Sequence, residues 1–259
     1  MWNDIKDYWF AKMVLVCNGM RNKMSGFVKY TIRRLKVFLK VAIGREFLIK
    51  PDIVCSKERF GAEYGGWDII TAGINMNSIV YSFGVGEDAS FDTALIKKFN
   101  LYIQGFDPTP KSIDWVKKQN FSNHFILHEY GIAVFDGTIS FNPPENPDHV
   151  SHTLLDRPST KEWAISVPVK KLSTIMKELG HKQIDILKMD IEGAEYDVIK
   201  DIHDSDIRPR QILIEFHHRF PGVGIEKTKG AIETIKAMGY SLFSVSATNE
   251  EFGFIWNND

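Results

Sequence analysis

The stretch SFGVGEDASFD, residues 82–92, decides the fold of this chain. It ends an apolar run, residues 79–83, and leads into residues 90–99, where Phe91, Leu95 and Phe99 recur at helical spacing. Two more polar stretches, FDPTP (106–110) and KMDIEGAE (188–195), also lie between a strand-like and a helix-like segment. In an open parallel sheet, ligands bind beyond the carboxyl ends of the strands. The three stretches therefore predict one binding site on an α/β protein.

The remaining apolar runs predict the sheet around this site. Residues 101–106, 125–130, 184–189 and 212–216 are typical of buried strands, and helical patterns follow most of them. The last two runs, 240–245 and 252–256, are joined by a connection too short for a parallel crossover. We therefore expect an α/β fold with a mostly parallel sheet, a C-terminal antiparallel hairpin and helices on both faces. A second hairpin is expected within 133–141, turning at Asp136-Gly137, and a surface loop at 143–158.

Composition excludes several classes of protein. The chain has 259 residues, with 44% hydrophobic and 25% charged residues, which is ordinary for a globular protein. It contains no uninterrupted apolar run of about 18 residues, so a spanning helix is not expected. Its two cysteines support neither a disulfide framework nor a thiolate zinc site, so a reducing cytoplasm is the expected location.

Charge is distributed unevenly along the chain. Residues 1–50 carry a net charge of +8 and the remainder carries −9, and an acidic body argues against a nucleic-acid surface. We expect residues 1–46 to form a basic helical extension and residues 47–259 to form the main domain. Residues 1–45 are expected either to rest on an anionic membrane, with Trp2, Trp9 and Phe10 as anchors, or to pack on their own protein.

Four strings narrow the prediction to a family. SFGVGEDASFD, FDPTP, VPVKKL (167–172) and DILKMDIEGAEYDVI (185–199) resemble the FkbM-type methyltransferases, which have the Rossmann-like sheet of class I S-adenosylmethionine-dependent methyltransferases. The resemblance covers residues 60–256. It implies an O-methyltransferase acting on a hydroxyl of a sugar, glycan or other secondary metabolite. N-methylation of a small molecule or lipid head group, and a catalytically silent scaffold, remain alternatives. The oligomeric state is left open.

The expected cofactor site combines glycines with acidic residues. Glycines let the backbone approach a ligand closely, and carboxylates attract a sulfonium and an ammonium but not a pyrophosphate. Asp107 follows Gly84 by 23 residues, which suits a carboxylate that binds ribose hydroxyls. Many relatives have Asp where this chain has Ser82, so Glu87 or Asp88 is expected to take that role. Asp88 is also a possible N-cap, and Asp92 is favoured as a first-turn acid. The predicted cofactor residues are Gly84, Gly86, Glu87, Asp88, Asp107, Gly131, Ile132 and Asp190.

The expected catalytic residues follow the fourth and fifth core strands. They are Asp190, Glu192, His217 and His218, with His217 as general base because imidazole suits proton transfer near neutral pH. No metal is expected, but Asp190, Glu215 and His217 could together bind a divalent ion. A nicotinamide oxidoreductase is the rival enzyme, because residues 84–89 satisfy G-x-G-x-x-A and Tyr196 and Lys200 have a Tyr-x-x-x-Lys spacing.

Overall fold

The computed structural model describes residues 26–63, 65–141 and 165–257. The chain divides into two compact units, one of residues 1–49 with 246–249 and one of residues 50–245 with 250–259. The predicted boundary at residue 46 remains a prediction. Trp2, Trp9, Phe10 and the expected loop at 143–158 lie outside the described residues.

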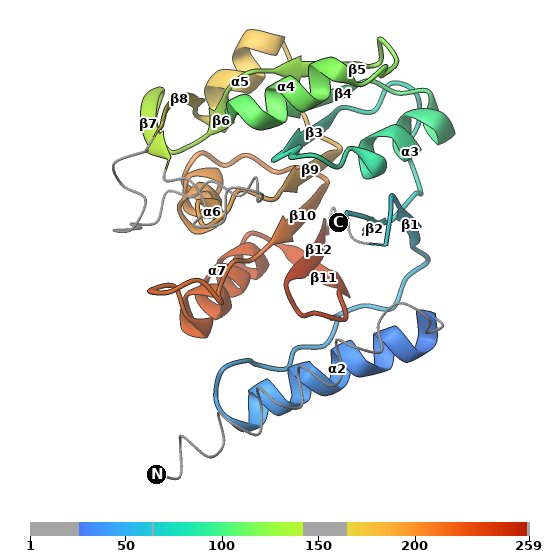
Figure 1. The fold of residues 1–259 in the computed structure, drawn as a ribbon, viewed down its shortest axis with the longest axis vertical. Coiled ribbons are helices and arrows are strands. Elements are labelled where there is room, and N and C mark those ends of the chain that lie inside the picture. Colours follow the sequence, from blue (N-terminus) through green and yellow to red (C-terminus); the bar gives the residue numbers. More distant parts are fainter. Residues whose placement is uncertain (1–25, 64, 142–164, 258–259) are drawn as a thin grey trace. The chain divides into compact units, whose positions relative to one another are not determined.

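The larger unit is built on a seven-stranded sheet in the order β11-β12-β10-β9-β3-β4-β5 (Figure 1). The five strands from β10 to β5 pair in parallel, whereas β12 pairs antiparallel with both β10 and β11. The mostly parallel α/β sheet with a C-terminal antiparallel hairpin is therefore confirmed. The strands are β3 (Val80–Phe83), β4 (Ile103–Phe106), β5 (Phe125–His128), β9 (Ile186–Met189), β10 (Gln211–Glu215), β11 (Tyr240–Val245) and β12 (Glu251–Trp256).

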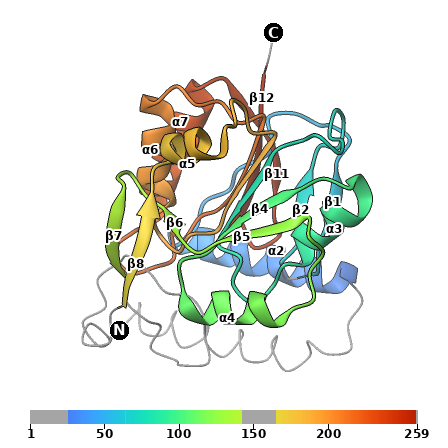
Figure 2. The same ribbon diagram turned by 90° about the horizontal axis from the view of Figure 1, so that it is seen from above.

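Helices connect these strands on both faces of the sheet. From β3 the chain moves through β4 to β5, and from β9 it moves the other way to β10. Because parallel crossovers are right-handed, the two directions place their helices on opposite faces. Figure 2 shows α6 and α7 on one side of the sheet and α3 on the other. The helices are α3 (Ser90–Phe99), α4 (Pro110–Lys118), α5 (Leu172–Leu179), α6 (Glu195–Asp204) and α7 (Ile225–Ala237).

The register of the central strands brings the three polar stretches together. Strands β3, β4 and β9 are buried at all four positions, as expected for a sheet covered on both faces. Phe83, the last residue of β3, pairs with Phe106 in β4 and with Met189 in β9. All three strands therefore end at the same level of the sheet. β3 and β9 also flank the point where strand order reverses, the place where α/β sheets bind ligands.

Two small sheets complete the larger unit, and one of them corrects a prediction. β1 (Glu58–Phe60) pairs antiparallel with β2 (Trp67–Ile69). The expected hairpin within 133–141 is wrong, because β8 (Ile165–Lys170) lies between β6 (Gly131–Ile132) and β7 (Gly137–Phe141). The carboxylate of Asp136 accepts hydrogen bonds from the Lys171 N–H and the Thr174 hydroxyl, each at 2.8 Å. It therefore secures the start of α5 rather than a two-stranded turn.

The smaller unit contains helix α2 (Gly26–Ala42) in its described part. The helical prediction for residues 1–45 is thus met over those residues, and residues 1–25 lie outside the description. Asn249 donates hydrogen bonds from Nδ2 to the Glu46 carboxylate and the Phe47 carbonyl, both at 3.0 Å. Among the helices described, none combines the length and the apolar character needed to cross a bilayer.

Candidate functional site

A cavity of about 510 Å³ opens at the carboxyl ends of β3, β4 and β9. Residues from all three polar stretches line it, as do residues of β6, β10 and β12. All the cofactor residues predicted from the sequence line this cavity: Gly84, Gly86, Glu87, Asp88, Asp107, Gly131, Ile132 and Asp190.

The glycines of the first turn differ in what surrounds them. Gly84 and Gly86 both have positive φ, +76° and +58°, a region that glycine enters without steric cost. A Cβ on Gly84 would lie 1.8 Å from the carbonyl oxygen of Asp190, so the turns after β3 and β9 are in backbone contact. A Cβ on Gly86 would meet no atom within 4 Å. Gly84 is therefore required by the packing of the fold, whereas Gly86 faces open space.

Asp107 joins the first turn to the second. Its Oδ2 accepts a hydrogen bond from the Gly86 N–H at 2.9 Å. Its Oδ1 accepts from the Thr109 N–H at 2.9 Å and from the Thr109 hydroxyl at 2.6 Å. The side chain is almost fully buried and lines the cavity. It fixes the shape of the Gly-rich turn, and its predicted contact with a ribose remains a prediction.

Lys188 also holds the Gly-rich turn, and the sequence analysis did not predict it as a site residue. It is a buried residue of β9 whose Nζ donates to the Gly84 carbonyl at 2.6 Å, and it lines the cavity. Asp92 lies near it, and burial raises the pKa of this carboxyl while the charge of Lys188 opposes the shift. Asp92 lies in the first turn of α3, as expected, and is in addition buried. The signal in the sequence that could have identified Lys188 is a lysine among the apolar residues of a buried strand.

The acidic residues of the first turn have mixed surroundings. Ser82 is fully buried in β3 and does not line the cavity, whereas Glu87 and Asp88 do. The N-cap position of α3 is Ala89, and the Asp88 carboxylate accepts from the Ser90 N–H at 2.8 Å. The N-cap predicted at Asp88 is therefore wrong by one position, although its carboxylate assists the helix start. Asp88 also lines the cavity, and its role in binding the cofactor remains a prediction.

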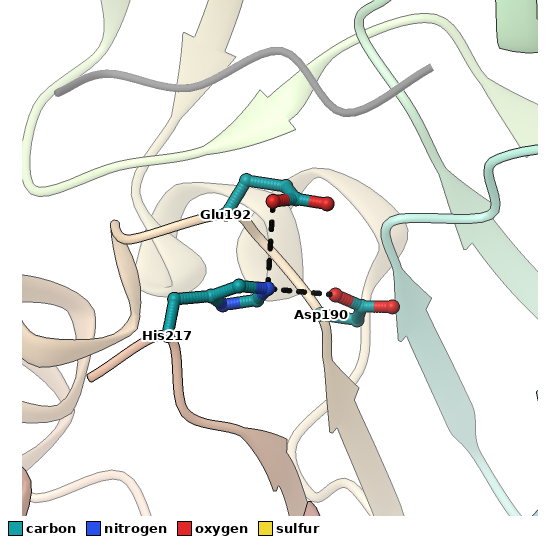
Figure 3. A group of neighbouring side chains, drawn as sticks. All are labelled: Asp190, Glu192 and His217. Atoms are coloured by element: carbon teal, nitrogen blue, oxygen red, sulfur yellow. Dashed lines mark ion pairs between the residues drawn. The ribbon is translucent and has the colours of Figure 1, made fainter. Parts of the chain in front are cut away.

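His217 lies between the carboxylates that follow β9 (Figure 3). Its Nε2 is 3.4 Å from Oε2 of Glu192 and 3.7 Å from Oδ1 of Asp190. On the other side of the ring, Nδ1 is 3.3 Å from Oε1 of Glu195, which also accepts the His217 backbone N–H at 2.9 Å. Glu195 is completely buried, and its carboxylate orients the imidazole. Glu192 has φ of +51°, an uncommon conformation for a residue with a side chain.

Burial and neighbouring charge perturb two groups of this region. Burial alone would lower the pKa of His217, but the hydrogen bond and charge of Glu195, with the charges of Glu192 and Asp190, raise it to about 10. Burial raises the pKa of Glu215 well above the usual range, and the charge of Asp190 adds to this. In the protein alone at neutral pH, the imidazole is therefore cationic and Glu215 is protonated.

Not every predicted catalytic residue joins this group. His218 is buried and does not line the cavity. Within the described residues, the side chains whose ligand atoms lie within 4.8 Å of one another are Asp190, Glu192 and His217, so Glu192 stands where Glu215 was expected. Glu215 lines the cavity and pairs across the sheet with Glu251, a cavity residue that sequence reasoning missed.

Comparison with known proteins finds related chains. A family model described as the methyltransferase FkbM domain matches residues 74–242. The chain is 24% identical over 196 residues to a probable methyltransferase-like protein 24 from Rattus norvegicus, covering 75% of this chain and 45% of that protein. The human counterpart is 24% identical over 195 residues, covering 74% and 44%. The chain thus spans less than half the length of these curated relatives.

Solved structures also match the chain, among them a member of the same family. The methyltransferase FkbM from Methylobacillus flagellatus KT aligns with a TM-score of 0.46 and 14% identity. The alignment covers 71% of this chain and 44% of that one.

Proposed function

The chain belongs to the FkbM methyltransferase family, and from this premise we propose that it is an S-adenosylmethionine-dependent O-methyltransferase. The proposed acceptor is a hydroxyl of a sugar, glycan or other secondary metabolite. The observation that carries the proposal is the single cavity lined by the Gly84–Gly86 turn, Asp107 and Asp190. Three separate segments of the chain meet there, each with the residue type that the cofactor would need.

The residues present fit S-adenosylmethionine. Gly86 leaves open space beside the turn, and the buried carboxylate of Asp107 lies at the cavity wall, where it could accept hydrogen bonds from a ribose. Glu87, Asp88 and Asp190 offer carboxylates to the positive groups of the cofactor and would repel a pyrophosphate. When bound, the cofactor supplies a methyl group on a positively charged sulfur. The same wall therefore disfavours the nicotinamide alternative.

The acceptor side of the cavity is assigned to Asp190, Glu192 and His217. Methyl transfer to a hydroxyl would require the hydroxyl to give up its proton to a nearby group. Asp190 and Glu192 line the cavity, and His217 lies behind them with its ring held by Glu195. Because the imidazole of His217 already carries a proton, the carboxylates of Asp190 and Glu192 would orient the hydroxyl and receive its proton. Alignment of this kind is the main contribution a protein makes to a displacement reaction.

Calorimetry on the full chain tests the proposal. We expect S-adenosylmethionine to bind at a one-to-one ratio and NADH to show no heat of binding, because the acidic turn attracts one and repels the other. Transfer of a labelled methyl group to a panel of hydroxyl and amine acceptors then separates O- from N-methylation. Binding without transfer to either class would favour a silent scaffold, and binding of NADH alone would overturn the proposal.

We also propose that helix α2 rests on an anionic membrane. Four large apolar side chains are between 40% and 59% exposed on it, namely Val28, Tyr30, Leu35 and Phe38. The helix carries five basic residues and no acidic one: Lys29, Arg33, Arg34, Lys36 and Lys40. Exposed apolar and basic side chains on one helix are typical of an interfacial segment.

Vesicle sedimentation checks the membrane proposal. The full chain should sediment with phosphatidylserine vesicles at least about tenfold better than with neutral ones, because several basic residues each add attraction near an anionic surface. Replacing Leu35 and Phe38 by serine should reduce sedimentation with the anionic vesicles. Equal recovery with neutral and anionic vesicles would contradict the proposal.

A further inference from the structure

We infer that Asp190, Glu192 and His217 form a binding site for a divalent transition-metal ion at the wall of the cavity. The site itself rests on the geometry of these side chains. Its use in methyl transfer rests on the proposed function above.

The spacing of the three side chains suits a shared cation better than direct hydrogen bonds. The distances from Nε2 of His217 to the two carboxylate oxygens, 3.4 and 3.7 Å, are longer than ordinary hydrogen bonds. Two ligand atoms that each lie about 2.1 Å from one ion are separated by roughly 3–4 Å. One cation between the three groups would therefore satisfy all of them at normal bond lengths, with only small movements of the side chains.

The setting of His217 gives independent support. A histidine that binds a metal through one ring nitrogen usually donates the other N–H to a carboxylate or a carbonyl. Here Nδ1 faces the fully buried carboxylate of Glu195, which also accepts the backbone N–H groups of Gly193 and His217. This carboxylate therefore holds His217 by one bond to its ring and one to its backbone, and it directs Nε2 of the buried histidine at Asp190 and Glu192 (Figure 3).

The charge of the cavity also favours a second cation. Seven carboxyl residues line it, and Lys188 is the one basic residue among the described lining residues. S-adenosylmethionine brings a net charge of only +1, so bound cofactor leaves the wall rich in carboxyl groups. A divalent ion at the mouth would offset part of this excess.

The donor set indicates the kind of ion. Carboxylate ligands suit Mg²⁺ and Mn²⁺, whereas imidazole suits the transition metals, so a site with both fits an ion such as Mn²⁺ better than Mg²⁺. Asp190 and Glu192 line the cavity and His217 does not. An ion held between them would face the cavity, where an acceptor oxygen could reach it and become more acidic. Binding of the ion would displace the proton of the His217 imidazole into solvent, so that Nε2 could bind the ion with its lone pair. The ion would then acidify the acceptor hydroxyl.

Electron paramagnetic resonance of Mn²⁺ tests the site on the full chain. Free Mn²⁺ gives a strong signal that falls on binding, and we expect saturable one-to-one binding to the metal-free protein. Glu192→Gln should weaken this binding by at least about tenfold, since it removes an ionised ligand from a partly exposed position that should tolerate the change. His217→Ala should do the same. Glu195→Gln, which acts on the three proposed ligands only through the histidine ring, should weaken binding by about 10–100-fold.

His203→Ala is the matched control. His203 and Asp204 form an exposed imidazole–carboxylate pair with 2.9 Å between Nδ1 and Oδ1, outside the cavity. Binding should be unchanged in this variant. Absence of saturable Mn²⁺ binding, or binding kept in both Glu192→Gln and His217→Ala with circular dichroism showing folded protein, would overturn the inference.

The same samples separate this inference from the proposed function. After treatment with a chelator, each is titrated with S-adenosylmethionine by calorimetry. Cofactor binding without Mn²⁺ binding would remove only the metal site. Mn²⁺ binding without cofactor binding would leave the metal site in place and remove the proposed methyl transfer.

Discussion

Gly84→Ala should abolish S-adenosylmethionine binding and lower the free energy of unfolding by about 3–5 kcal/mol. The added Cβ would lie 1.8 Å from the Asp190 carbonyl oxygen, which is backbone and cannot turn away. The positive φ of Gly84 adds further strain for any residue with a side chain. Thermal denaturation should show a loss of about 10 °C in Tm. Calorimetry should show no heat of cofactor binding.

Gly86→Ala is the matched control for that prediction. It places a methyl group at a similar positive φ, but no atom lies within 4 Å of the added carbon. The expected loss of stability is therefore only about 1–2 kcal/mol, from backbone strain alone. The added methyl could still obstruct a cofactor, so stability is the property on which the two variants are compared. Equal losses of Tm in both would contradict the proposed contact between the turns.

Asp107→Ala should weaken S-adenosylmethionine binding by about 3 kcal/mol, roughly a hundredfold in Kd. The substitution removes the acceptor of three hydrogen bonds, one from Gly86 and two from Thr109. It also removes the carboxylate proposed to accept from the ribose hydroxyls. Calorimetric titration with the cofactor measures the change.

Asp114→Ala is the control for the loss of a carboxylate. Asp114 is exposed on α4 and does not line the cavity. We expect the Kd of S-adenosylmethionine for the Asp114→Ala variant to match that for the unaltered protein. Unchanged affinity in the Asp107 variant would mean that the cofactor lies elsewhere in the cavity or does not bind.

The strands of the main sheet and its C-terminal hairpin could be predicted because their signals are local. Buried parallel strands appear as short apolar runs, and each of the three site turns is marked by glycine or by acidic residues directly after such a run. The family resemblance drawn from the motifs is confirmed by the match over residues 74–242, which contains all of them. The hairpin within 133–141 could not be recognised as wrong, because β8 is supplied by residues far along the chain.

The details of the site depended on backbone conformation and side-chain packing, which the sequence alone does not specify. Glu192 has a positive φ that the sequence does not announce, and its carboxylate lies with Asp190 and His217, where Glu215 was expected. The burial of Glu195 and Lys188 depends on how α6 and β9 pack against their neighbours. The predicted cofactor residues fared better, because glycines and strand-end carboxylates need little side-chain reach to line the cavity.

The contact between Gly84 and Asp190 has a thermodynamic consequence. Asp190 touches the proposed cofactor turn through its backbone and reaches the proposed acceptor side through its carboxylate. A movement of Asp190 would therefore change both the cofactor side and the acceptor side of the cavity. Linkage requires that if the acceptor alters the affinity for the cofactor, the cofactor alters the affinity for the acceptor by the same factor. The affinities for the two substrates should therefore be coupled through this shared residue.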